Sequence, residues 1–449
     1  MTTYTDPECA VSFADSLDSM RGLIFFSLVA LLFQFALAPT PCKYAAPYSR
    51  RTTVAQLSPD SPLLDSLLRA QPGRFDSVLR RADELNLQII YTQITRDAQN
   101  QPHFARHPWH LDPARYFNPA SLVKLPVCIA ALEKLHRYEA QGVTPATPMA
   151  TGVAYRCQTP VARPQHPDPD RVASVGNYVR RMLLVSDNDA YNRLYEFVGQ
   201  AELHERLSAW QMPTARITNR FTPGCDSVAN RYTNPIIFYP AGRPPVTQAP
   251  AFNRRPLLPP LGPVRIGRGY RAAGNRLVPE PYDFTNANYL TLDHVTTLLQ
   301  SILFPGTGVE LHLTAPNRQL LVRYLGLAPH ESGYSLYKSK GYYDCYKKYA
   351  LYGRDPHLPY PTGDLRSFNI VGLSYGYVAD CAYFAEPSTG TEFMLSAVLY
   401  VNRDGILNDG QYEYESVGWP VLRELGRTIY EFERGRVKPN PPDLNDFRL

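Results

Sequence analysis

Residues 121–135 read SLVKLPVCIAALEKL, and residues 186–188 read SDN. The first stretch is an apolar helical pattern that opens with Ser121 and carries Lys124 one helical turn later, so both side chains are predicted to share one face. A serine hydroxyl is a weak nucleophile until a neighbouring group takes its proton, and a buried lysine with a lowered pKa can do so. The order S-x-x-K then S-D-N is typical of enzymes that acylate their own serine.

Context distinguishes this S-x-x-K from a second one at residues 335–338, which lies among Gly and Tyr with no helical pattern after it. At the start of a buried helix, Ser121 gains backbone N–H groups and the positive end of the helix dipole. The alternatives are a helix cap for Ser186 and a surface lysine for Lys124, with its aliphatic stem on apolar surface. Both motifs in the expected order favour the catalytic interpretation.

Composition indicates a globular protein with irregular insertions. The 449 residues are 44% hydrophobic and 19% charged, and they include 42 prolines, which is enough for a large core in one domain or two subdomains. The net charge is +5, and no Lys/Arg run is interleaved with aromatic residues, so no nucleic-acid partner is predicted. There is no C-x-x-C pair, and Pro108 breaks the spacing of His103, His107 and His110. We therefore expect no metal and no cofactor.

The N-terminus has the pattern of an export signal. Arg21 precedes an apolar run, residues 22–38, that ends in Ala-Leu-Ala. We predict a signal peptide or N-terminal anchor over 1–42 and a linker over 43–60, with export to the periplasm. Retention in the membrane through the apolar run and lipidation at Cys42 remain alternatives.

Strand patterns occur towards both ends of the chain, at residues 88–95, 376–385 and 392–402, and helical patterns fill the middle, including 119–138. An amphipathic helix is predicted over 419–433. This order predicts an α+β fold that an all-helical subdomain interrupts. The predicted parts are an α/β subdomain over 61–118 and 288–434, a helical subdomain over 119–287 with a Pro/Arg-rich insertion at 238–282, and a tail over 435–449.

On its two motifs the chain resembles the class A β-lactamase and penicillin-binding-protein superfamily of serine hydrolases, over about residues 61–434. The resemblance implies a five-stranded antiparallel sheet flanked by helices, with the site between the sheet and the helical subdomain. It implies that Ser121 is acylated, with its backbone N–H in the oxyanion hole, and that Lys124 helps to deprotonate it. Ser186 would relay a proton to the leaving nitrogen, and Asn188 would hold a substrate amide.

The family's third motif, K-T-G on a strand, has two possible registers. Residues 375–382 carry the Tyr-Gly, Asp and Ala that follow the motif in the family, which places it at residues 370–372, IVG. We favour this register, which makes Gly372 a substrate-binding candidate but replaces the lysine and hydroxyl residue by Ile and Val. Weak affinity for ordinary penicillins is then expected, because that lysine would attract a carboxylate. The alternative register uses residues 338–341, where Lys340 would supply the charge.

The family's deacylating carboxylate, where present, is a Glu with Asn four residues later. Asp226 and Asn230 have this spacing. Asp226 is therefore a candidate base that activates water against the acyl-enzyme. The alternative is a solvated loop aspartate, which would leave a long-lived acyl-enzyme, as in peptidoglycan peptidases.

The sequence thus predicts an exported serine hydrolase that cleaves β-lactam amides. One alternative is a D-Ala-D-Ala-type peptidoglycan peptidase, and another is a non-catalytic binding protein on a degenerate hydrolase fold. The expected partner is a β-lactam or a cell-wall peptide, and we expect a monomer.

Overall fold

The computed structural model describes residues 59–334, 337 and 341–449. The chain divides into two compact units, Met1–Arg51 and Thr52–Leu449, and everything below concerns the described part of the second. The predicted leader and Lys340 lie outside the described residues.

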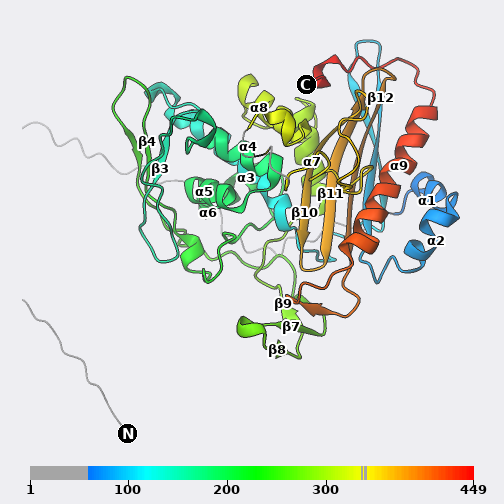
Figure 1. Ribbon diagram of the computed structural model, residues 1–449, viewed down its shortest axis with the longest axis horizontal. Helices are drawn as coiled ribbons and strands as arrows, with labels where there is room; N and C mark the ends of the chain where they lie inside the picture. The colour runs from blue at the N-terminus through cyan, green and yellow to red at the C-terminus, as the bar shows by residue number, and fades with distance from the viewer. Residues whose placement is uncertain (1–58, 335–336, 338–340) are drawn as a thin grey trace, which may run out of the picture. The chain divides into compact units, whose positions relative to one another are not determined.

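The main sheet has five antiparallel strands in the order β10-β11-β12-β1-β2. Neighbouring residues on a strand point to opposite faces, and both faces are covered, so β11 and β12 are buried along nearly their whole length. The predicted fold class, an antiparallel sheet flanked by helices with an inserted helical subdomain, is confirmed (Figure 1), but the inserted part is not all-helical, because it also contains a small three-stranded sheet. The strands are β1 (Gln88–Arg96), β2 (Pro102–Trp109), β10 (Arg366–Ser374), β11 (Tyr377–Glu386) and β12 (Thr391–Tyr400).

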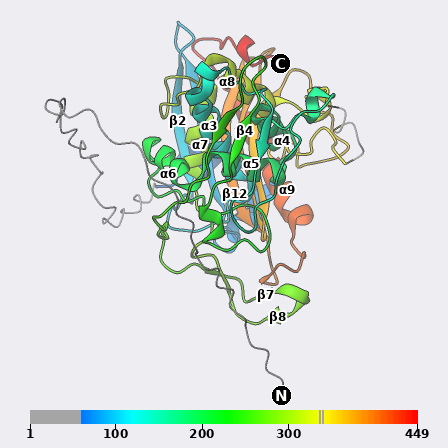
Figure 2. The same ribbon diagram turned by 90° about the vertical axis from the view of Figure 1, so that its left-hand side faces the viewer.

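Helices cover the two faces of the sheet and bury a separate apolar core on each. One core takes Ile89, Val371 and Leu395 from the sheet, and the other takes Ile90 and Ile370. Figure 1 shows the first face under α1, α2 and α9, and Figure 2 shows the inserted helices in front of the sheet. The helices are α1 (Pro62–Arg69), α2 (Pro72–Arg80), α3 (Lys124–Leu135), α4 (Val175–Val185), α5 (Asn188–Val198), α6 (Gln200–Ala209), α7 (Leu292–Leu303), α8 (Ala315–Gly326) and α9 (Trp419–Gly435).

The helix predicted over 119–138 is three consecutive pieces. A 3-10 turn, η1 (Ala120–Val123), precedes α3, and a second, η2 (His136–Gln141), follows it. Pro126 lies in the first turn of α3, where its missing N–H removes no intrahelical hydrogen bond. The tight turn η1 therefore carries Ser121, and the regular helix begins at Lys124.

The Pro/Arg-rich insertion predicted over 238–282 contains short strands. Its strand β7 pairs in parallel with β13, which follows the main sheet, so the insertion lies at one end of that sheet (Figure 1). The short strands are β3 (Met149–Thr151), β4 (Ile236–Phe238), β5 (Val246–Gln248), β6 (Arg265–Ile266), β7 (Gly269–Arg271), β8 (Leu277–Val278), β9 (Tyr282–Asp283) and β13 (Ile406–Leu407).

Cys157 and Cys225 form a disulfide across 68 residues of chain. No helix among the described residues has both the length and the apolar character needed to span a bilayer.

Candidate active site

The turn η1 presents Ser121 directly before α3. The Asn118 side chain accepts a hydrogen bond from the Ala120 N–H at 2.8 Å, and Ala120 has a φ of 45°, a conformation that non-glycine residues rarely adopt. Lys124 is the first residue of α3 and is fully buried. Its Nζ lies 2.9 Å from the Ser121 Oγ. The predicted nucleophile and its lysine are therefore in hydrogen-bond contact.

The S-D-N triplet is the junction of α4 and α5. Ser186 ends α4 in the left-handed conformation, at φ 59° and ψ 40°, and the Asp187 side chain caps α5 by accepting the Ala190 N–H. This reversal directs three oxygen atoms at Lys124 Nζ, namely Ser186 O at 2.5 Å, Ser186 Oγ at 2.9 Å and Asn188 Oδ1 at 2.8 Å. Four of the predicted site residues thus meet around one amine.

The contacts of Lys124 match those of a neutral amine. Ser186 O and Asn188 Oδ1 are acceptors only, whereas the two hydroxyls can donate. A neutral amine has two N–H groups for the two acceptors and one lone pair, which can accept a hydrogen bond from one of the two hydroxyls at a time. Burial, and then the nearby charge of Lys347, lower the pKa of Lys124 to about 7. A substantial fraction of this lysine is therefore neutral at physiological pH.

Lys347 is a site residue that the sequence analysis missed. It is buried, and its Nζ donates to the carbonyl of Leu183 in the last turn of α4, just before Ser186. Its own carbonyl accepts from the Asn369 side chain on β10 at 2.6 Å. Lys347 therefore links the sheet to the helix that presents Ser186. Nothing local in the Tyr-rich segment 331–367 identifies it, because its partners lie far away in sequence.

Strand β10 lies against the nucleophile's turn, and Gly372 is the point of closest approach. A Cβ on Gly372 would lie 2.8 Å from the Pro119 carbonyl and 3.2 Å from the Leu122 side chain. Residues 370–372, the favoured register for the third motif, therefore lie beside Ser121. The Ile370 and Val371 side chains point into the two apolar cores.

A cavity of about 480 Å³ opens over Ser121 and Asn188. The helical part of the chain, the insertion and the end of β10 all contribute to its wall. The remaining lining residues are Asn118, Ala120, Asn219, Phe221, Tyr282, Asp283, Phe284, Asn286, Ala287, Asn288, Leu373, Ser374 and Tyr375.

Residues 82–250 match the beta-lactamase enzyme family. This match confirms the resemblance predicted from the two motifs, both of which lie inside it. The β-lactamase-like match ends before β10, so it does not cover the third motif.

Solved structures similar to this β-lactamase-like chain include a β-lactamase from Sphaerobacter thermophilus DSM 20745, at 14% identity and a TM-score of 0.42 over 84% of this chain and 98% of that one. PBP-A is similar at 16% identity and a TM-score of 0.45, with the same coverage. A β-lactamase from Burkholderia ambifaria is similar at 13% identity and a TM-score of 0.40, over 84% of this chain and all of that one. No curated protein matches the chain.

Asp226, the candidate deacylating base, is not brought into the cavity. Its carboxylate pairs with Arg156 and accepts the Ala229 N–H at 2.7 Å, and its side chain is about half exposed (49%). Asp283 is the only carboxylate among the described residues that line the cavity. The cavity therefore holds Ser121 with Lys124 behind it, whereas Asp226 lies outside the cavity wall.

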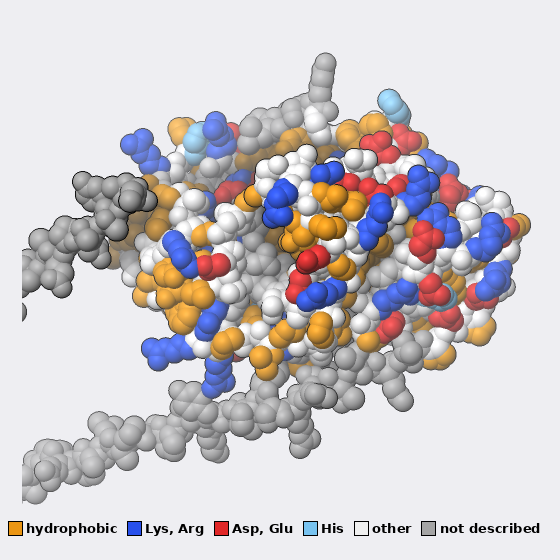
Figure 3. All heavy atoms as spheres, turned by 90° about the horizontal axis from the view of Figure 1, so that it is seen from below, with side chains coloured by type: hydrophobic (Ala, Val, Ile, Leu, Met, Phe, Trp, Pro, Cys, Tyr) orange, Lys and Arg blue, Asp and Glu red, His pale blue; other side chains and the backbone are white. Residues whose placement is uncertain are grey.

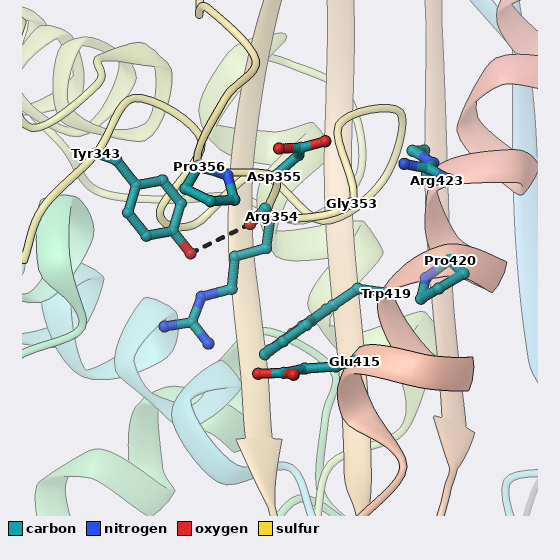
Figure 4. A pocket seen from close by; sticks show the side chains of 9 residues that line it. All are labelled: Tyr343, Gly353, Arg354, Asp355, Pro356, Glu415, Trp419, Pro420 and Arg423. Atoms are coloured by element: carbon teal, nitrogen blue, oxygen red, sulfur yellow. Dashed lines mark hydrogen bonds between the residues drawn. The ribbon is translucent and has the colours of Figure 1, made fainter.

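A second hollow, of about 440 Å³, lies beside the start of α9 (Figure 4). Trp419 and Arg423 from α9 line it, together with Tyr343 and Arg354, whose guanidinium lies over the Trp419 ring at 4.7 Å. It contains none of the predicted site residues. No group of three or more His, Cys, Asp or Glu side chains in the described part of the chain is placed to hold a metal ion.

Proposed function

We propose that this chain is an exported serine hydrolase of the β-lactamase type, which opens β-lactam amides through an acyl-Ser121 intermediate. The observation that carries the proposal is the position of Lys124, whose Nζ lies 2.9 Å from both the Ser121 and the Ser186 hydroxyl oxygens. One amine can therefore take a proton from the nucleophile and pass it towards the leaving group.

Acylation follows from these contacts in two steps. Neutral Lys124 accepts the Ser121 proton while Oγ attacks the amide carbonyl carbon, and the Ser121 N–H stabilises the oxyanion that forms. An outward N–H of the edge strand β10, which lies beside Ser121, would supply a second donor. The C–N bond then breaks, the proton passes from Lys124 through Ser186 Oγ to the leaving nitrogen, and an ester on Ser121 remains.

Asn188 is the candidate for orienting the substrate. Its Oδ1 accepts from Lys124, and its amide nitrogen has no hydrogen-bond partner within the described residues. That nitrogen is free to donate to a substrate carbonyl at the cavity wall.

A specific observation favours a second candidate, a penicillin-binding protein of the D-Ala-D-Ala peptidase type. Asp226 pairs with Arg156 and does not line the cavity. Without Asp226 to activate water, the acyl-enzyme would be long-lived. The two candidates share the acylation step and differ in how fast the ester on Ser121 is hydrolysed.

Intact-mass measurement after a penicillin pulse tests both candidates. We expect an adduct on the wild-type protein and none on Ser121→Ala, which should also lose hydrolysis of a chromogenic cephalosporin by roughly 10³-fold or more. Rapid loss of the adduct supports the β-lactamase, and a persistent adduct supports the peptidase. If neither penicillin nor any other acylating probe modifies Ser121, the chain is the non-catalytic binding protein.

Export is part of the proposal, and the Cys157–Cys225 disulfide supports it, because such bonds persist in oxidising compartments. Fractionation of cells that express the full chain tests it. Recovery of the protein in the periplasm or the membrane is expected, and recovery in the cytoplasm with free thiols at both positions would rule export out.

A further inference from the structure

The cavity over Ser121 has an unusual charge for a site that would receive a carboxylate. Among its described lining residues there is no Lys or Arg, and the only charged side chain is Asp283. Binding sites for carboxylates normally use Arg or Lys, because a charge-assisted hydrogen bond offsets the lost hydration of the anion.

The cationic side chains behind the cavity already have hydrogen-bond or ion-pair partners. Lys124 faces four oxygen atoms, and Lys347 is buried and donates to Leu183 O. Arg181, beside the S-D-N triplet, pairs with Asp187 at 2.8 Å. None of these three groups lines the cavity.

Strand β10 explains why this wall carries no charge. Its Ile370 and Val371 side chains point into the two cores, and the residues that reach the cavity are Leu373, Ser374 and Tyr375. The wall beside the nucleophile is therefore built from neutral groups.

The last residue of the insertion and the two residues after it add aromatic rings and one acid to the wall. Tyr282 and Phe284 pack against Tyr375, with ring centroids 5.5 Å and 5.2 Å apart. Asp283 lies between them in sequence, is exposed, and accepts the Thr285 N–H at 2.8 Å. Hydrogen bonds from the Thr285 side chain and backbone, and then the charge of Arg265 on the paired strand β6, lower the pKa of Asp283, so it is ionised at neutral pH. Aromatic faces next to a carboxylate favour apolar or cationic groups and oppose anions.

From this arrangement we propose that the site takes acyl donors without a carboxylate beside the scissile amide, and that an uncharged or cationic group lies against Asp283 and the aromatic wall. The inference rests on the proposed acyl-Ser121 chemistry and names its substrate class.

Three forms of one acyl donor test it, namely benzylpenicillin, its methyl ester and its diethylaminoethyl ester. They share the β-lactam and differ in charge, which is negative, zero and positive. The second-order rate constant for Ser121 acylation is measured by intact mass and divided by each compound's rate of hydrolysis by hydroxide. We expect the methyl ester to react at least about tenfold faster than the acid, and the cationic ester at least as fast as the methyl ester.

Asp283→Asn should reduce the ratio between the cationic and the neutral ester. Glu280→Gln, which removes an exposed acid of the same segment outside the cavity, should leave this ratio unchanged. If the acid acylates Ser121 as fast as its methyl ester, the inference is wrong while the proposed function stands. If none of the three compounds modifies Ser121, the proposed function itself fails.

Discussion

At the residue scale, the site depends on keeping a buried lysine uncharged without leaving it unpaired. Two acceptor-only oxygens, Ser186 O and Asn188 Oδ1, hold Lys124 in place and use the two hydrogens of a neutral amine. A buried ammonium group would be poorly solvated and close to a second lysine, Lys347, so the neutral form is favoured.

A pH profile tests this account. A lysine base works only when neutral, so the rate constant for acylation should rise with pH through an apparent pKa of about 7. Lys347→Met removes the nearby positive charge, so the pKa of Lys124 should rise. The rise of the acylation rate constant should therefore occur at higher pH than in the wild type. The rate at neutral pH falls accordingly.

Lys348→Met is the matched control. Lys348 is the adjacent buried lysine, and it donates to Leu325 O and Ser367 O, but its charge is not among the causes of the Lys124 shift. Its replacement should leave the apparent pKa of the acylation rate constant unchanged. If the pH dependence of the acylation rate constant is the same in Lys347→Met as in the wild type, Lys347 has only a structural role.

At the element scale, the site forms where one tight turn, one helix junction and one strand edge meet. Ala120 and Ser186 have positive φ, and so does Tyr375 at the end of β10. Such strain persists only where surrounding structure enforces it, and it gathers at functional sites. Ala120 and Tyr375 line the cavity, and Ser186 contacts Lys124.

Gly372→Ala tests the contact between β10 and η1. The new Cβ would lie 2.8 Å from the Pro119 carbonyl, so the strand or the turn must shift. We expect a loss of roughly 1–3 kcal/mol in the free energy of unfolding. Acylation should slow by about tenfold or more, because small displacements of a nucleophile are costly.

The control for this change is Gly73→Ala in α2, where nothing lies within 4 Å of the new Cβ. It should be neutral or stabilising by up to about 1 kcal/mol, because alanine favours a helix over glycine. Denaturant unfolding and the acylation rate are measured for both variants. An unchanged rate in Gly372→Ala would show that β10 does not position Ser121.

At the scale of the whole molecule, two apolar cores hold one sheet between two helical layers, and the surface carries mixed charge. Figure 3 shows Lys and Arg interspersed with Asp and Glu on the face it presents. No single-sign field of the kind that attracts a polyanion is visible there, in keeping with the modest net charge of +5. Selectivity for substrate charge is therefore expected to arise inside the cavity.

The disulfide gives a prediction at this scale. Cys157 and Cys225 close a span of 68 residues that includes the S-D-N triplet. Replacing both by Ser should lower the free energy of unfolding by roughly 4 kcal/mol, because the unfolded chain loses a long cross-link. Urea unfolding of the two proteins measures the difference, and a reductant should bring the wild type to the level of the variant. If reductant does not lower the free energy of unfolding of the wild type, the Cys157–Cys225 disulfide is contradicted.

The sequence predicted the helices and strands whose hydrophobic periodicity is visible in a short stretch of chain. The amphipathic pattern at 419–433 became α9, and the strand patterns at 376–385 and 392–402 became β11 and β12. It missed the division of 119–138 into η1, α3 and η2, because the positive φ of Ala120 is imposed by packing and leaves no mark in the periodicity.

What the sequence determined by itself is the pairing of Ser121 with Lys124, because one helical turn brings them together whatever surrounds them. Tertiary structure alone decided that Lys347 donates to Leu183 O, that Asp226 pairs with Arg156, and that Asp283 lines the cavity. Each of these depends on segments far apart in the chain meeting in space. Local spacing carries no information about such contacts, since packing and long-range strand pairing determine them.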